Sequence, residues 1–199
     1  MGITIHFSGR LKSEDSLPAL IEEVEDIAEA YRWKSFTFEK IFPPGHYGKK
    51  TFDDNLYGIC FSPPDCEPVS FSFLSNGKVV SLPGWQWHHS QGQKVDKTEL
   101  FSFFKTQFAG PEVHKILIHI LRYLSKKYFR NFKLIDEGDY WETNDEKLLN
   151  EKFDFLNGML NFISAELEGN PRKKDQSLDD YMETLFRIIQ EKRKNKQDK

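Results

Sequence analysis

An α+β fold is predicted for this chain: an antiparallel sheet from the N-terminal half, packed by an N-terminal helix and about three C-terminal helices. Two observations predict it. Stretches in which apolar and polar residues alternate dominate the first half, and stretches with apolar residues at helical spacing dominate the second. The connections between the early strands are too short for helical crossovers, so these strands are expected to pair antiparallel.

The chain opens with a predicted strand and a predicted helix. Residues 3–8 alternate between apolar and polar side chains, which is typical of a half-buried strand. After a turn over residues 9–16, apolar side chains recur at helical spacing over residues 17–31. Pro18 is compatible with this helix because it falls in the first turn.

Further strands are predicted in the next part of the chain. The alternation around Phe36 and Phe38 indicates one strand, and the apolar run at residues 56–61 indicates another. Residues 69–82 alternate clearly and carry Asn76-Gly77 in their middle, so they are expected to form a hairpin with this pair at its turn.

The middle of the chain is less regular. Residues 83–97 are polar apart from two tryptophans and are expected to be irregular, and residues 98–104 fit either a strand or a short helix. A helix with a long apolar stripe is then predicted from Pro111, with Gly110 as its cap. Residues 132–136 follow as a short apolar strand.

Two helices are predicted in the last third. Apolar residues at helical spacing over residues 148–167 indicate a long helix, which Gly169 ends. Ser177 and Asp180 have the spacing of a cap for a final helix. We therefore expect a single α+β domain over residues 1–170. Residues 171–199 are expected to form a linker and an amphipathic helix packed on that domain, with a frayed basic tail.

Composition narrows the classes of protein. The formal net charge is −3, and this balance argues against a general nucleic-acid binder, although a local basic patch stays compatible with it. The N-terminus lacks the pattern of a secretory signal, and no apolar run is long enough for a membrane span. The two cysteines, Cys60 and Cys66, fit a reducing compartment, so a cytoplasmic protein is expected.

The segment DEGDYWETND, residues 136–145, places five carboxylates around two aromatic rings. Part of it has a structural explanation, because Thr143 and Glu146 have the spacing of a capping box and the helix dipole favours negative charge beside them. Tyr140 and Trp141 can close over the edge of the core. The remaining carboxylates are explained either by a solvated loop or by a functional site. These are Asp136, Glu137, Asp139 and Glu142.

Three histidine-containing patterns offer further candidates. His114 lies near a helix N-terminus, so it can line a small polar pocket with Thr106 and Gln107, or it can be a boundary residue with one backbone hydrogen bond. His119 falls on the polar side of that helix. Another pattern combines Trp85, Trp87 and His88, which suit either ligand contact or a loop held on the core by its tryptophans.

Two functions are consistent with these features. The first is a small intracellular non-enzymatic binding or regulatory protein, without a cofactor, whose acidic-aromatic surface contacts a protein partner with a basic surface. The second is a hydrolase or transferase that depends on a divalent cation, with Asp136, Glu137 and Glu142 as metal ligands and His114 nearby. The absence of standard catalytic motifs favours the first.

Overall fold

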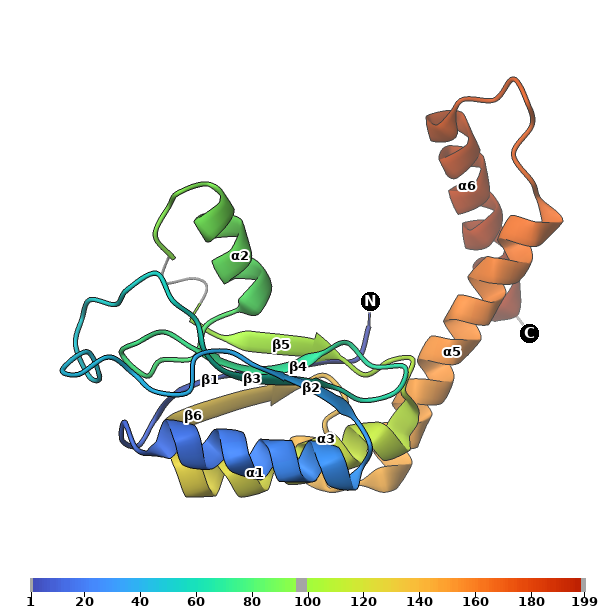
Figure 1. The fold of residues 1–199 in the computed structure, drawn as a ribbon. Helices are drawn as coiled ribbons and strands as arrows, with labels where there is room; N and C mark the ends of the chain where they lie inside the picture. Colours follow the sequence, from blue (N-terminus) through green and yellow to red (C-terminus); the bar gives the residue numbers. More distant parts are fainter. Residues whose placement is uncertain (1, 96–99, 198–199) are drawn as a thin grey trace. The chain divides into compact units, whose positions relative to one another are not determined.

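The structure, a computed structural model, describes residues 2–95 and 100–197, with side chains described as far as Gln190. Within these residues the predicted α+β class is confirmed: the chain forms two antiparallel sheets of three strands each and six helices. Its internal contacts divide the chain into two compact units, Met1–Phe153 and Asp154–Lys199. Both sheets belong to the first unit (Figure 1).

The first sheet has the strand order β5-β1-β6, with β1 (Thr4–Leu11) between β5 (Ser102–Lys105) and β6 (Phe129–Asp136). The sequence predicts one sheet from the N-terminal half, whereas two of these strands come from beyond residue 100. The inward side chains of β1 are buried, so the backbone hydrogen-bonding groups on both of its edges need partners within the protein. Strands β5 and β6 supply these partners, although they are distant in the sequence. Strand β5 also settles residues 102–104 as strand, while residues 98 and 99 lie outside the described residues.

The second sheet has the order β2-β3-β4, formed by β2 (Lys34–Thr37), β3 (Tyr57–Ser62) and β4 (Val69–Phe73). The turn predicted at Asn76-Gly77 is present, since the Gly77 N–H donates to the Leu74 carbonyl at 2.8 Å. The returning segment does not form a full strand. It pairs with β4 through the Phe73–Val79 bridge and the Val80 N–H, which donates to the Ser72 carbonyl at 3.0 Å. It also bonds to β1, because the Val79 N–H donates to the Gly9 carbonyl at 3.0 Å.

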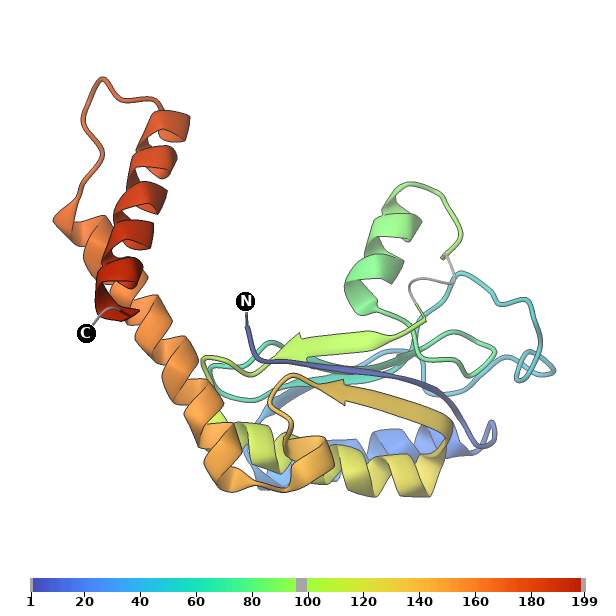
Figure 2. The same ribbon diagram turned by 180° about the vertical axis from the view of Figure 1, so that it is seen from behind.

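Helices α1 (Ser16–Ala30) and α3 (Gly110–Tyr128) lie side by side on one side of the sheets (Figures 1 and 2). Their predicted apolar stripes are buried, as expected for amphipathic helices. Glu23 of α1 accepts hydrogen bonds from Lys127 at 2.8 Å and from the Tyr128 hydroxyl, so a polar contact also joins the two helices at their edge.

Aromatic side chains connect the two sheets in the core. The ring centroids of Phe7 and Phe71 are 5.5 Å apart, and Phe71 lies 6.3 Å from Phe129. These separations are typical of favourable aromatic packing. Because Phe7 and Phe129 belong to the first sheet and Phe71 to the second, these three rings pack the two sheets against each other.

Residues 82–90 correct the expectation of an irregular stretch at 83–97. They form helix α2 (Leu82–Ser90). The Ser81 hydroxyl accepts from the Gly84 N–H at 3.1 Å, and a proline stands in the first turn. These are the ordinary start signals of a helix, which outweigh the polar composition of the segment. Residues 96 and 97 of that prediction lie outside the described residues.

The second unit is a helical hairpin of α5 and α6 (Leu178–Gln197). Helix α5 (Glu146–Gly169) begins in the first unit and enters the second at Asp154. The predicted cap of α6 is confirmed, because the Asp180 N–H donates to the Ser177 hydroxyl at 3.1 Å. That residues 171–199 pack on one domain spanning residues 1–170 stays a prediction. Among the described helices, none is long and apolar enough to cross a membrane.

Candidate functional site

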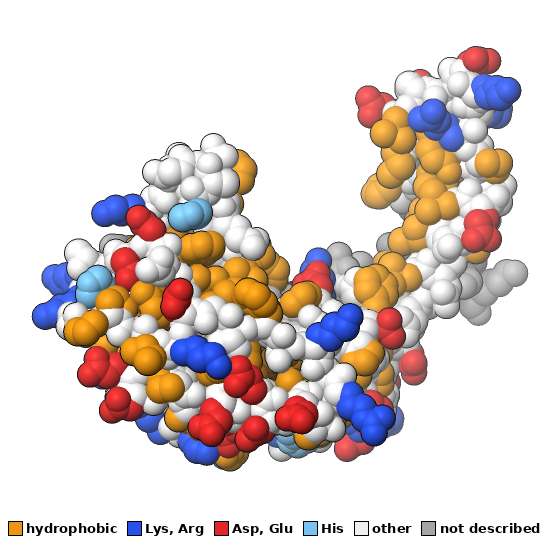
Figure 3. Space-filling model, in the orientation of Figure 1, with side chains coloured by type: hydrophobic (Ala, Val, Ile, Leu, Met, Phe, Trp, Pro, Cys, Tyr) orange, Lys and Arg blue, Asp and Glu red, His pale blue; other side chains and the backbone are white. Residues whose placement is uncertain are grey.

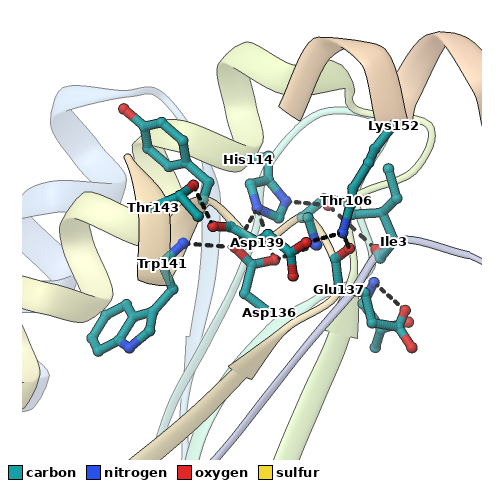
Figure 4. A network of polar contacts seen from close by, with 12 residues as sticks. Ile3, Thr106, His114, Asp136, Glu137, Asp139, Trp141, Thr143 and Lys152 are labelled. Carbon is teal, nitrogen blue, oxygen red and sulfur yellow. Dashed lines mark hydrogen bonds and ion pairs between the residues drawn. The ribbon is translucent and has the colours of Figure 1, made fainter. Parts of the chain in front are cut away.

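The centre of the predicted site is a buried chain of three polar side chains from three elements (Figure 4). Thr106 follows β5, His114 lies on α3 and Asp136 ends β6. The Thr106 hydroxyl is 2.7 Å from His114 Nδ1, and His114 Nε2 is 3.1 Å from Asp136 Oδ1. Thr106 and His114 are fully buried, and the side chain of Asp136 is also inaccessible. The network therefore joins the ends of two strands to one helix.

The charge state of Asp136 follows from its surroundings. Burial by itself would raise its pKa, but the hydrogen bond and the electrostatic interaction with His114 lower it, and so do the N–H groups of Trp141 and Gly138. The balance holds the pKa of Asp136 below its usual value. An ionised carboxylate is thus kept inside the protein by one imidazole and two backbone donors.

Hydroxyl, imidazole and carboxylate in this order are also the groups of a nucleophilic triad. A catalytic hydroxyl must reach a substrate, and that of Thr106 is buried and 3.3 Å from the Ile3 carbonyl. The expected grouping of Thr106, Gln107 and His114 is present in part. The alternative of a boundary His114 with one backbone hydrogen bond is wrong, because His114 is fully buried and contacts the side chains of Thr106 and Asp136. Thr106 and His114 do meet, whereas Gln107 Oε1 is buried without a hydrogen-bond partner among the described residues.

Asp136 also shapes the segment that follows it. Its Oδ1 accepts from the Gly138 N–H at 2.7 Å, and its Oδ2 accepts from the Trp141 N–H at 2.9 Å. Gly138 is tightly enclosed, because a Cβ atom there would lie 2.8 Å from Leu149 Cδ1 and 2.9 Å from His114 Nε2. Only glycine fits this turn without displacing its neighbours.

Arg122 of α3 holds the short helix α4 (Tyr140–Thr143) from the other side. Its guanidinium donates to the Tyr140 carbonyl at 3.0 Å and to the Trp141 carbonyl at 2.8 Å, and it also contacts Asn144. It lies 5.5 Å from the centroid of the Trp141 ring. A planar guanidinium makes several directed contacts at once, so α4 is anchored although it has only one turn.

The other carboxylates of the segment have separate partners. Glu137 Oε2 accepts from the Thr4 N–H at 2.8 Å, and Asp139 forms an ion pair with Lys152 at 2.5 Å. Lys152 also donates to the Glu137 carbonyl at 2.8 Å (Figure 4). Glu142 is exposed. Of these three carboxylates, Asp139 thus has a cationic partner, Glu137 binds a backbone N–H and Glu142 faces solvent.

The capping box predicted from Thr143 and Glu146 is wrong. Helix α5 begins at Glu146, and Asp145 is its cap: Asp145 Oδ1 accepts from the Lys147 N–H at 2.9 Å and from the Leu148 N–H at 3.1 Å. Asp is preferred over Thr as a helix cap, which agrees with the later start.

The alternative metal site is not assembled. Over the side chains of residues 2–95 and 100–190, no group of three or more His, Cys, Asp or Glu is arranged to hold a metal ion. Asp136 points into the core, Glu137 binds the backbone of β1, and Glu142 faces solvent, so these three do not converge.

The tryptophan candidates lie on α2. Trp85 packs against the buried cluster of Leu56, Leu74 and Val80, which supports the interpretation that a tryptophan holds this segment on the core. Trp87 is 62% exposed. His88 Nδ1 is buried and has no hydrogen-bond partner in the described part of the chain. Figures 1 and 2 show α2 on the opposite side of the sheets from α3, so these residues do not join the acidic-aromatic segment.

Two surfaces were not found by sequence reasoning. One is a groove of about 570 Å³ lined by four cationic side chains of the first unit, Arg10, Lys78, Arg130 and Lys133. The other is an apolar groove of about 650 Å³ within the hairpin of the second unit, where hydrophobic side chains gather (Figure 3). The cations are scattered in the sequence and carry no local signal. The apolar residues of the hairpin have helical spacing, which does not distinguish a core face from an exposed one.

No protein family, no curated protein and no solved structure matches this chain at a significant level. The function is therefore argued from the geometry of its own residues.

Proposed function

We propose that this chain is a small non-enzymatic binding or regulatory protein, and that its acidic-aromatic segment, residues 136–145, contacts a protein partner with a basic surface. One observation carries the proposal: Arg122 and Asp136 hold the segment rigid from within, while Glu142 faces solvent and Trp141 is partly exposed. A preordered surface loses little conformational entropy on binding. An aromatic ring beside carboxylates combines an anchor with electrostatic steering.

The buried network supports a binding role over a catalytic one. Its hydroxyl, imidazole and carboxylate are all inaccessible, so they serve the shape of the segment and not a substrate. We place the function in the cytoplasm, because Cys60 and Cys66 are both free and free cysteines fit a reducing compartment.

Site-specific photo-crosslinking tests the surface. A photoreactive residue replaces Glu142 in one variant and the exposed Asp54, in a different loop, in a control. We expect a discrete crosslinked protein from position 142 only. The purified partner should then bind at least tenfold more weakly to Glu142→Lys than to the wild type, with Asp54→Lys unchanged. Equal binding to all three proteins would contradict the proposal.

A thermal melt separates this function from the metal-dependent alternative. The protein is melted with EDTA and then with Mg²⁺, Mn²⁺, Ca²⁺ or Zn²⁺, since a ligand of the folded state raises the melting temperature. We expect no rise with any ion. A rise that is lost in Glu142→Gln would instead support a metal site in the acidic-aromatic segment.

A further inference from the structure

The outward face of the β5-β1-β6 sheet carries side chains that no part of the proposed function uses. Alternation along β1 buries Ile5 and Phe7 in the core and turns His6, Ser8 and Arg10 outward. On β6, Ile135 is 67% exposed on the same face, directly opposite His6. In Figure 2 these strands are nearest to the viewer, in front of the second sheet.

Three cations form one row across this face. Arg10 is the register partner of Arg130 on β6, and an isolated bridge pairs it with Lys78 on its other side. Like charges directly opposite each other on neighbouring strands are destabilising. No carboxylate of the described residues forms an ion pair with any of the three. Arg130 also lies 5.6 Å from the centroid of the Tyr47 ring. A bound anion would offset the repulsion between these neighbouring cations.

A β-bulge adds a fourth cation. Between the pairs Ser8–Lys133 and Arg10–Arg130, strand β1 advances by two residues and β6 by three. Residues three apart on a regular strand point to opposite faces, but the extra residue of the bulge turns both Arg130 and Lys133 into the same groove. The β-bulge therefore places the positive charges of Arg130 and Lys133 in the same groove.

An aromatic groove of about 450 Å³ adjoins the basic one, and the two share Ser8 and Lys133. His6 and Phe101 line it, with their ring centroids 6.4 Å apart. Phe103 lies 6.0 Å from His6 and 5.8 Å from Phe101, so the three rings form one cluster. Flat rings next to a row of cations are the two elements by which proteins hold unpaired bases and their phosphates.

We propose that this face binds single-stranded nucleic acid, with phosphates along Lys78, Arg10, Arg130 and Lys133 and a base on His6 and Phe101. The adjoining rings favour a strand with exposed bases over an acidic peptide or a duplex, because neither of those offers a free π-face. The net charge of −3 argues against general nucleic-acid binding but does not describe this local row. Up to four phosphate contacts predict a slope of log K against log salt of about −3 at most.

Fluorescence anisotropy of the full chain with labelled dT12 and rU12 tests this site. We expect binding at low salt that weakens with the slope above. Arg10→Gln and Lys78→Gln should each weaken binding about tenfold without loss of folded stability, because each relieves repulsion within the row. Lys126→Gln, the same substitution at an exposed position of α3, should leave binding unchanged. Phe101→Leu, which keeps an apolar side chain but removes the ring, should weaken binding about fivefold or more.

Several results would overturn the assignment. Absence of binding to both oligonucleotides would do so, and so would equal binding by Arg10→Gln, Lys78→Gln and the wild type. Binding of inorganic pyrophosphate or of a 12-base-pair duplex as tightly as dT12, with no effect of Phe101→Leu, would show a simple anion site. Glu137 of the acidic-aromatic segment borders the aromatic groove, but Arg10, Lys78 and Phe101 lie outside that segment, so this test and the crosslinking test fail independently.

Discussion

His114 Nε2 and Asp136 Oδ1 lie 3.1 Å apart, and both side chains are fully inaccessible to solvent. The pair connects the first turns of α3 to the end of β6 and fixes the start of the acidic-aromatic segment. A buried charge that has lost its partner is strongly destabilising, so this contact should be visible in the stability of the whole first unit.

Asp136→Asn removes the charge while it keeps the size of the side chain. We expect it to lower the free energy of unfolding by about 2–4 kcal/mol at pH 7, because His114 and two backbone donors lose a carboxylate acceptor. Urea denaturation measures the effect. Asp54→Asn, at an exposed position, is the control and should change stability by less than about 0.5 kcal/mol. Similar effects of the two substitutions would show that the pair does not stabilise the fold.

The pH dependence follows from the lowered pKa of Asp136. Between the folded and the unfolded pKa the unfolded chain binds more protons, so stability rises with pH in that interval. The contribution is fully present above the ordinary Asp pKa of about 3.9 and is lost as pH falls through the lowered value. The difference between wild type and Asp136→Asn should therefore shrink in urea melts below about pH 4. If the stability difference between wild type and Asp136→Asn stayed constant down to pH 2.5, this would contradict the role of the Asp136 carboxylate in the pH dependence.

Gly138→Ala tests the enclosed turn. The added Cβ would lie 2.8 Å from Leu149 Cδ1 and 3.0 Å from Asp136 Oδ1, so we expect a loss of about 1–3 kcal/mol and a lower melting temperature. Gly158→Ala is a matched substitution within α5, where no atom lies within 4 Å of the new Cβ. It should be neutral or stabilising by up to about 1 kcal/mol. If Gly158→Ala were more destabilising than Gly138→Ala, the turn at Gly138 would be open.

Arg122→Lys keeps the positive charge and removes the planar donor group. We expect faster amide hydrogen exchange over Tyr140–Thr143 and a loss of about 1–2 kcal/mol, since one ammonium cannot replace all the contacts of the guanidinium. Arg187→Lys, at an exposed position of α6, is the control. Unchanged exchange in both variants would show that α4 is ordered without Arg122.

The two thiols should be unreactive in the folded protein. Burial, together with the charge of Glu67, raises the pKa of Cys66 to about 12, and burial raises that of Cys60. Only the thiolate reacts with a disulfide reagent, so at pH 8 we expect labelling at least about 100-fold slower in the folded chain than in urea. Rapid labelling of either cysteine without denaturant would show that its pKa is not raised by burial.

Sequence patterns predicted the elements whose signals are local. The apolar stripe of α1 and the Ser177–Asp180 cap of α6 depend on residues three or four positions apart, and both are present. The start of α5 was misassigned because the T-x-x-E spacing of Thr143 and Glu146 matches a capping box, whereas Asp145, the better capping residue, is the cap. Helix α2 was missed because its start signals at Ser81 and in its first turn lie within a polar stretch.

The candidate site was predicted in its residues but not in its arrangement. Asp136 and His114 were both named, yet their contact depends on β6 pairing with β1 across the fold, which no local period encodes. The cations Arg10 and Arg130 carry no motif, and they become neighbours only through the register of two strands distant in the chain.

By itself, the sequence determined the α+β class and the amphipathic helices, because hydrophobic periodicity acts between near neighbours in the chain. Tertiary structure alone decided the burial and the neighbours of the charged side chains. Asp136 is buried against His114, and Arg10 is placed between Lys78 and Arg130. The physical reason is that the energy of a charge depends on its solvent exposure and on partners within a few ångströms, and strand pairing brings those partners from distant parts of the chain.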